Sequence, residues 1–187
     1  MWALIEDGSI TKLINNPRGM IIDDIQYSRN IFSFRWSNEE REAIGLYEVV
    51  FNNTNKKDEK YYNNTNQSFA FAGGVVTASY GSATAKALAD VTNEDDSITP
   101  GLKTKHKEII KRQASSLLTI YDWYVIRKAD AGTAVPSAIT TYRAAVRTKS
   151  GEMETLIDAC STVDELAALY IRNVDGVRPL GEFPEAV

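Results

Sequence analysis

Short runs rich in apolar, β-branched and aromatic residues, broken by turn residues, recur over the first 80 positions, which predicts short strands joined by tight turns. The segments 2–6 (WALIE) and 9–14 (SITKLI) flank Asp7-Gly8, a pair that tolerates the positive φ angles of a hairpin turn. The segment 68–81 (SFAFAGGVVTASYG) predicts a second hairpin around Gly73-Gly74. Further strand candidates are MIIDDIQYS (20–28), NIFSF (30–34) and LYEVVF (46–51). We therefore expect a small antiparallel β domain.

Two helical signals interrupt this part of the chain. Ser37 precedes an acidic segment that ends at Gly45, so it predicts a brief capped helix. Residues 84–91 (TAKALADV) are long enough for two helical turns. The Asn-rich stretch 52–67 indicates an ordered surface loop.

After residue 102 the apolar residues recur with the period of an amphipathic helix. The first helix is predicted from Lys103 to Ile120, and a second from a cap at Asp122 to Gly132, with Trp123, Tyr124 and Ile126 turned inward. A third helix is predicted over 136–161. A short fourth helix follows the capping-box pair Thr162 and Glu165.

These patterns predict an α+β fold in which a small antiparallel β domain precedes a three- to four-helix domain. We expect a β-rich docking domain over 1–91, a linker over 92–102, a helical domain over 103–172 and an extended tail over 173–187. The linker is suggested by Asp95, Asp96, Pro100 and Gly101.

Charge and composition argue against several classes of function. The net charge is -4, and it divides into -5 for residues 1–100 (9 basic, 14 acidic) and +1 for residues 101–187 (12 basic, 11 acidic). Neither part is basic enough to follow a phosphate backbone, so we expect no nucleic-acid partner. No apolar stretch is long enough to span a membrane, no secretory signal is apparent, and we expect synthesis in a cytoplasm.

The sequence contains few of the residues and motifs that enzymes use for catalysis. The chain has one cysteine, Cys160, and one histidine, His106, which we expect on an exposed helix face. Phosphate-binding glycine loops and nucleophile motifs do not appear. Asp23 and Asp24 are adjacent in a predicted strand, so their carboxylates would point to opposite faces. We therefore expect neither enzymatic activity, nor a metal, nor a cofactor.

Aromatic residues are the remaining candidates for function, because large rigid rings suit contact with other proteins. Trp36, Tyr61 and Tyr62 are candidates in the first domain. If its segment is extended, one ring of the Tyr61–Tyr62 pair should face outward. In the helical domain the candidates are Asp122, Trp123, Arg127, Tyr142 and Arg143, with an Arg–Asp contact expected at the corner between helices.

The helical part resembles the C-terminal region of bacteriophage tail assembly chaperones and tail-fibre-associated proteins. The likeness covers residues 103–170 and rests on motifs in a fixed order: Leu117-Leu118, Asp122-Trp123, Arg127-Lys128, the corner from Gly132 to Pro136, and the segment Tyr142–Arg147. A looser likeness to N-terminal regions of phage proteins covers Trp36 to Tyr47. We recognise no counterpart after Tyr170.

The resemblance implies a tail or tail-fibre context, with other phage tail or tail-fibre proteins as partners and several copies in one assembly. Our first hypothesis is a structural component located in the virion tail and associated with a fibre, baseplate or neck. The second is an assembly chaperone that leaves before the particle is complete. The third is a receptor- or glycan-binding module that uses Tyr61 and Tyr62.

Overall fold

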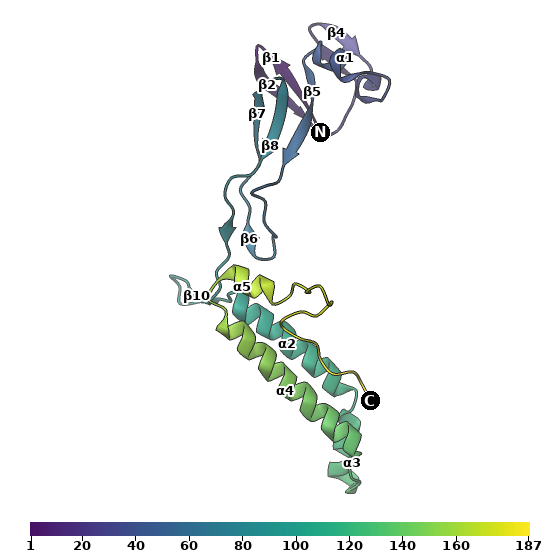
Figure 1. Cartoon of the computed structure of the whole chain (residues 1–187), viewed down its shortest axis with the longest axis vertical. Helices are drawn as coiled ribbons and strands as arrows, with labels where there is room; N and C mark the ends of the chain where they lie inside the picture. The colour runs from purple at the N-terminus through teal and green to yellow at the C-terminus, as the bar shows by residue number, and fades with distance from the viewer. The chain divides into compact units, whose positions relative to one another are not determined.

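Figure 1 shows the computed structural model, which describes all residues from 1 to 187. The chain forms two compact units, Met1–Thr84 and Ala85–Val187. The first is built mainly from strands and the second from helices, which confirms the α+β class. The division falls after residue 84, whereas the sequence pattern placed the end of the first domain at residue 91.

The first unit is organised around a five-stranded sheet with the order β2-β1-β5-β8-β7. Its two hairpins turn at Asp7-Gly8 and Gly73-Gly74, where all four residues have positive φ, as predicted. The expectation of a purely antiparallel sheet is wrong for one pair, since β5 and β8 run parallel. The strands are β1 (Trp2–Glu6), β2 (Ser9–Ile14), β5 (Leu46–Asn52), β7 (Ser68–Ala72) and β8 (Val75–Ser79).

The sheet curls so that β2 approaches β7. Because side chains alternate along a strand, one face of each strand points into the curl. Small and β-branched residues fill that interior, and aromatic rings of β5 and β7 cover them, with Tyr47 and Phe71 4.9 Å apart. The buried residues of this cluster are Ala3, Val49, Val76 and Ala78.

A layer of short elements packs against β1, β2 and β5 in a second cluster, separate from the one inside the curl. Its elements are β3 (Met20–Ile22), β4 (Ile25–Tyr27), the 3₁₀ helix η1 (Arg29–Phe32) and α1 (Asn38–Glu42). Two strand predictions are wrong here. Asp23 and Asp24 have positive φ and form the turn between β3 and β4, so they do not lie within a strand. The segment NIFSF begins in η1 because the Ser28 hydroxyl accepts the Asn30 N–H and caps it.

Buried Arg41 holds this layer in place. Its guanidinium donates to the carbonyl oxygens of Ile31 (2.9 Å) and Ser33 (2.5 Å) and lies 4.8 Å from the centre of the Trp2 ring. The cap predicted at Ser37 is present, and Glu40 extends it to a capping box that was not predicted from the sequence. Gly45 then turns with φ +74°, and a Cβ atom there would collide with the Ile5 carbonyl oxygen.

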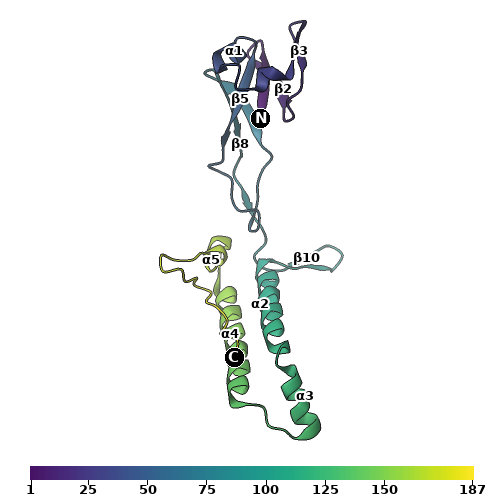
Figure 2. The ribbon, with the colours of Figure 1, turned by 90° about the vertical axis from the view of Figure 1, so that its right-hand side faces the viewer.

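Four helices form the second unit, as predicted: α2 (Leu102–Thr119), α3 (Asp122–Ala131), α4 (Ser137–Ala159) and α5 (Val163–Ala168). Helices α2 and α4 lie side by side and run in opposite directions, with α3 beyond the end of α2 (Figures 1 and 2). The fully buried side chains of this unit include Ile110, Val146, Met153, Ile157, Leu166 and Leu180.

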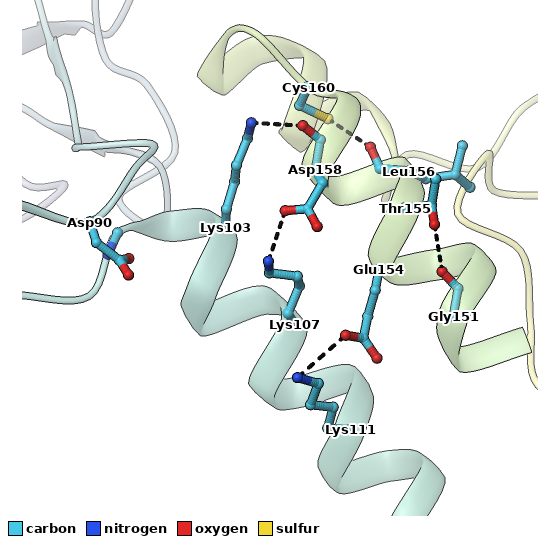
Figure 3. Close-up of polar contacts among 11 residues, drawn as sticks. Asp90, Lys103, Lys107, Lys111, Gly151, Glu154, Thr155, Leu156, Asp158 and Cys160 are labelled. Atoms are coloured by element: carbon cyan, nitrogen blue, oxygen red, sulfur yellow. Dashed lines mark hydrogen bonds and ion pairs between the residues drawn. The ribbon is translucent and has the colours of Figure 1, made fainter. Parts of the chain in front are cut away.

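Charged side chains bridge α2 and α4 along one side (Figure 3). Lys103 Nζ donates to the Asp158 carbonyl oxygen at 2.8 Å, Lys107 pairs with the Asp158 carboxylate at 2.8 Å, and Lys111 pairs with Glu154 at 3.4 Å. The three lysines are four residues apart, so they occupy successive turns of one helix face. All three contacts can form together at only one alignment of α2 against α4, so they favour this register of the two helices.

The segment before α2 is not helical, so the prediction for 84–91 is wrong. It contains β9 (Thr84–Ala85) and β10 (Val91–Thr92), and β10 pairs with β11 (Ile98–Thr99) inside the stretch expected to be a linker. The carbonyl oxygens of Ala87 and Leu88 accept the N–H groups of Leu102 and Lys103 at 2.9 and 3.0 Å. This backbone satisfies donors that the first turn of α2 would otherwise leave unpaired.

The residues after α5 contain no further helix or strand, and they lie against the helices. Leu180 is fully buried and its N–H donates to the Leu169 carbonyl oxygen at 3.0 Å. Glu182 pairs with Arg172 and Arg178 at 2.8 and 2.6 Å. Phe183 packs against the cluster that contains Tyr121. The tail is therefore held by its own unit.

Candidate docking site

Helix α3 exposes an unusual amount of apolar surface. None of its ten residues is buried; Trp123 is 49% exposed and Ile126 is 67% exposed. The prediction that Trp123 and Ile126 turn inward is therefore wrong; Tyr124 alone of the three packs against the core, while half-buried. The core ends instead at Tyr121, the residue just before α3. The Tyr121 ring meets the Tyr142 ring edge-on, with 5.3 Å between the ring centres.

Trp123, Tyr124 and Arg127 form a stack on α3. The two rings lie 3.9 Å apart, and the Arg127 guanidinium carbon lies 4.6 Å from the centre of the Trp123 ring and 5.3 Å from that of Tyr124. Arg127 makes no ion pair, and its buried Nε has no hydrogen-bond partner. Trp, Tyr and Arg are the residue types that dominate binding energy at protein interfaces. We define the α3 surface as Trp123, Ile126 and Arg127 of α3 together with Ile120, the residue that follows α2.

The predicted Arg–Asp contact exists between α4 and α3. The Arg143 guanidinium pairs with the Asp122 carboxylate at 2.8 Å and donates to the Leu118 carbonyl oxygen at 2.6 Å. Arg143 is 8% exposed, whereas the Asp122 side chain is half exposed. The contact joins the end of α2, the start of α3 and the first third of α4, so it fixes the position from which α3 projects.

A shallow groove of about 470 Å³ adjoins this contact. Its walls come from α2 and α4, and it carries hydroxyl groups and charges of both signs. Lys111 and Glu154 in its wall already pair with each other, and Arg143 pairs with Asp122. Arg147 makes no ion pair. The hydroxyls of Thr119 and Ser150 in this groove already donate, to the Ser115 carbonyl oxygen at 2.9 Å and to Glu154 at 3.2 Å.

Tyr142 lies beside this corner but does not reach a partner. Its ring is buried and its hydroxyl makes no hydrogen bond. Burial raises the pKa of the Tyr142 hydroxyl, with a smaller contribution from Tyr121. Tyr142 therefore packs in the core beneath Tyr121, the residue before α3, and is not accessible to a partner.

The candidates of the first unit are packed into that unit. Trp36 is half-buried and meets Tyr27 edge-on at 5.9 Å. Tyr61 and Tyr62, which begins β6 (Tyr62–Asn63), are 7% and 9% exposed, so the expectation that one ring faces outward is wrong. Lys57 Nζ lies 4.3 Å from the centre of the Tyr62 ring. Burial, followed by the negative charge of Asp58, raises the pKa of Tyr61.

The two residues with the most reactive side-chain chemistry serve the helical packing. His106 is half-buried rather than exposed as predicted, and its Nδ1 lies 2.7 Å from the Tyr170 hydroxyl. Cys160 is buried at the end of α4, and burial raises the pKa of its thiol. No group of three or more His, Cys, Asp or Glu side chains is arranged to hold a metal ion.

Sequence reasoning singled out Asp122, Trp123, Arg127, Tyr142 and Arg143; the structure pairs Arg143 with Asp122 and places Arg127 over the Trp123 ring. Sequence reasoning missed Ile120 and Ile126 as surface residues. A signal existed: Trp123 to Ile126 are four consecutive apolar or aromatic residues, and a helix cannot turn all of them toward one neighbour.

Comparison with known proteins adds no relative: no protein family, no curated protein and no solved structure matches this chain. No helix of the structure is both long enough and apolar enough to cross a lipid bilayer.

Proposed function

We propose that this chain is a non-enzymatic structural component of a bacteriophage tail, associated with a fibre, baseplate or neck, that acts by protein–protein docking. The observation that carries the docking role is the α3 surface, where Trp123 and two isoleucines lie exposed and Arg127, stacked on Trp123, has no carboxylate partner. Exposed apolar groups grouped in this way are typical of interaction sites.

The phage context is supported by the resemblance over residues 103–170. The Asp122-Trp123 and Arg127-Lys128 pairs that contribute to it are residues of α3 itself. On this proposal the protein is made in the host cytoplasm, resides in the virion tail in several copies, and contacts other tail or tail-fibre proteins.

An assembly chaperone that leaves before the particle is complete is the second candidate. The observation in its favour is the same exposed apolar helix, since a chaperone also needs a surface that covers apolar parts of its client. The receptor- or glycan-binding alternative loses its basis, because Tyr61 and Tyr62 are buried.

Mass spectrometry of washed virions separates the first two candidates. A structural component is recovered in a fixed ratio to the other tail proteins. Its absence from virions, with presence in infected cells, rejects the structural role and leaves the chaperone.

Substitution tests the α3 surface itself. Trp123→Ala with Ile126→Ala is expected to stop incorporation of the protein into particles while the purified variant keeps its helical circular dichroism. Ile109→Ala, which shortens an exposed isoleucine on α2, is the matched control and is expected to assemble normally. Normal incorporation of the double variant would exclude α3 as the docking element.

A further inference from the structure

The β10–β11 hairpin is a second feature without a packing partner in its own unit. We call residues 89–100 the arm; every one of them is exposed. Figure 2 shows the arm projecting from the chain beside the start of α2. An isolated two-stranded hairpin is marginally stable in water, so a partner surface would stabilise this one.

The tip of the arm is acidic and locally ordered. Glu94, Asp95 and Asp96 are consecutive, and the chain has no lysine or arginine between residues 87 and 102. The Asn93 side-chain amide donates to the hydroxyls of Ser97 and Thr99 at 2.9 Å each. Asp95 accepts from the Ser97 N–H and hydroxyl, while Glu94 and Asp96 make no ion pair.

The arm also presents apolar groups. Val91 and Ile98 are 44% and 65% exposed. They belong to successive cross-strand pairs, Val91 with Thr99 and Ile98 with Thr92, so they face opposite sides of the hairpin. Either face of the arm therefore offers one apolar side chain next to the acidic tip.

The α3 surface has the complementary chemistry. Trp123 and Ile126 offer apolar area, and the Arg127 guanidinium is held over two rings without a carboxylate. Lys128 on the next position makes no ion pair either. Asp130 lies one turn further along α3 and opposes these charges in part, but Asp122 is already paired with Arg143.

The arm and the α3 surface of one copy lie at opposite ends of α2. This helix has 18 residues, and a helix of that length measures about 27 Å. The arm of one copy therefore cannot reach its own α3 surface while α2 is intact. The complementary groups can meet only between two molecules.

We propose that the arm of one copy docks on the α3 surface of a second copy. The inference rests on the proposed docking function of α3 and names its partner as another copy of this chain. A contact between two different surfaces is head to tail. Its repetition builds a closed ring or a filament and does not stop at a symmetric dimer.

Charge reversal in the full-length chain tests the contact. Arg127→Glu alone, and Glu94→Lys with Asp96→Lys alone, are each expected to weaken self-association by about tenfold or more, as for central groups of an interface. The three changes together restore opposite charges and are expected to recover association. Light scattering coupled to size exclusion at low and at physiological salt measures the mass in each case.

Matched controls lie on α2. Glu108→Lys and Arg112→Glu reverse exposed charges that make no ion pair, and they are expected to leave the oligomer unchanged. Circular dichroism of every variant checks that the helices are intact.

A mixing experiment separates a head-to-tail contact from a symmetric one. The variant Trp123→Ala, Arg127→Ala keeps its arm, and the variant Glu94→Ala, Asp95→Ala, Asp96→Ala keeps its α3 surface. Each alone is expected to be monomeric. The equimolar mixture is expected to form a one-to-one dimer and nothing larger, because only one intact contact remains.

A wild-type chain that stays monomeric at high concentration overturns the inference, as does a triple charge reversal that does not restore association. The broader proposal is judged separately. If the wild-type chain is monomeric but the Trp123→Ala, Ile126→Ala variant is still excluded from particles, α3 docks on a different tail protein, and only the arm contact is rejected.

Discussion

At the scale of single residues, two buried polar groups at the corner between α2, α3 and α4 differ: the Arg143 guanidinium has hydrogen-bond partners, and the Tyr142 hydroxyl has none. Arg143 is buried but has a carboxylate and a carbonyl oxygen within hydrogen-bond distance. Tyr142, its neighbour in the chain, buries a hydroxyl that has no partner. A buried polar group without a hydrogen bond lowers stability, whereas its removal is close to neutral or favourable.

Tyr142→Phe is therefore expected to leave the free energy of unfolding unchanged or to raise it by up to about 1 kcal/mol. Urea denaturation followed by far-ultraviolet circular dichroism measures the change. Tyr121→Phe is the matched control, because the Tyr121 hydroxyl does donate, to the Val187 carbonyl oxygen, and its loss is expected to destabilise. A clear loss of stability in Tyr142→Phe would mean that the hydroxyl has a partner.

Residue chemistry also explains why α3 stays outside the core. Tyr121 and Tyr142 already close the end of the α2–α4 pair, with Phe183 from the tail packed against them. Trp123 does not take part in this cluster; its ring lies half exposed against Tyr124 and Arg127.

At the scale of elements, the start of α2 depends on the backbone that precedes it. Gly101 precedes the helix and makes no side-chain cap, and the carbonyl groups of 87 and 88 take over that role. The two segments are so close that a Cβ atom on Gly101 would overlap the Ala89 carbonyl group.

Gly101→Ala is expected to destabilise the helical unit by about 1–3 kcal/mol, the usual cost of inserting atoms into a filled space. Backbone lies on the other side of the contact, so no flexible side chain can move away. Thermal unfolding monitored by circular dichroism measures the effect. Gly151→Ala, at an open position of α4 where helix propensity favours alanine, is expected to stabilise instead.

Asp90 makes the same element sensitive to pH. Hydrogen bonds from the Thr104 side chain and from the Gly101 N–H lower the pKa of Asp90 below its ordinary value of 3.8. Because the folded-state pKa is the lower one, the charged carboxylate stabilises the fold at pH above 3.8, and the contribution is lost as the pH falls through the folded pKa.

Asp90→Asn is accordingly expected to be less stable than the wild type at neutral pH, with the difference disappearing as the pH falls below the carboxyl range. Urea midpoints of the two proteins at neutral pH and at the lowest pH where both remain folded provide the comparison. Asp130→Asn, which removes a carboxylate without an ion pair, is the control. A difference that persists unchanged in acid would show that the Asp90 charge is not its cause.

At the scale of the whole molecule, each unit has a hydrophobic core of its own. The first packs residues of the curled sheet and its covering layer, and the second packs α2, α4, α5 and the tail. Separate cores are the physical condition for independent folding.

The fragment 85–187 is therefore expected to fold alone, with a helical circular dichroism spectrum and a cooperative thermal transition. The same fragment without its tail, 85–172, lacks Leu180 and Phe183 and is expected to melt at a lower temperature. An unfolded 85–187 fragment would show that the helices require the first unit.

The sequence by itself determined the α+β class, the Asp7-Gly8 and Gly73-Gly74 hairpins, the helix cap at Ser37, the capping box at Thr162, and four helices after residue 102. These features are local: turn geometry, cap chemistry and apolar period all act within a few residues of one another. The Arg143–Asp122 contact was predictable for a related reason, since both residues flank one corner.

Only the tertiary structure decided the rest, because burial depends on what approaches from elsewhere in the chain. The parallel pairing of β5 with β8 and the burial of Tyr61 and Tyr62 are consequences of distant contacts. The exposure of Trp123, which the sequence predicted to turn inward, was also decided by contacts with other segments. Its position in the helix period suited an inner face, but Tyr121, Tyr142 and Phe183, which come from three different segments, pack together at this end of the core, and Trp123 is half exposed.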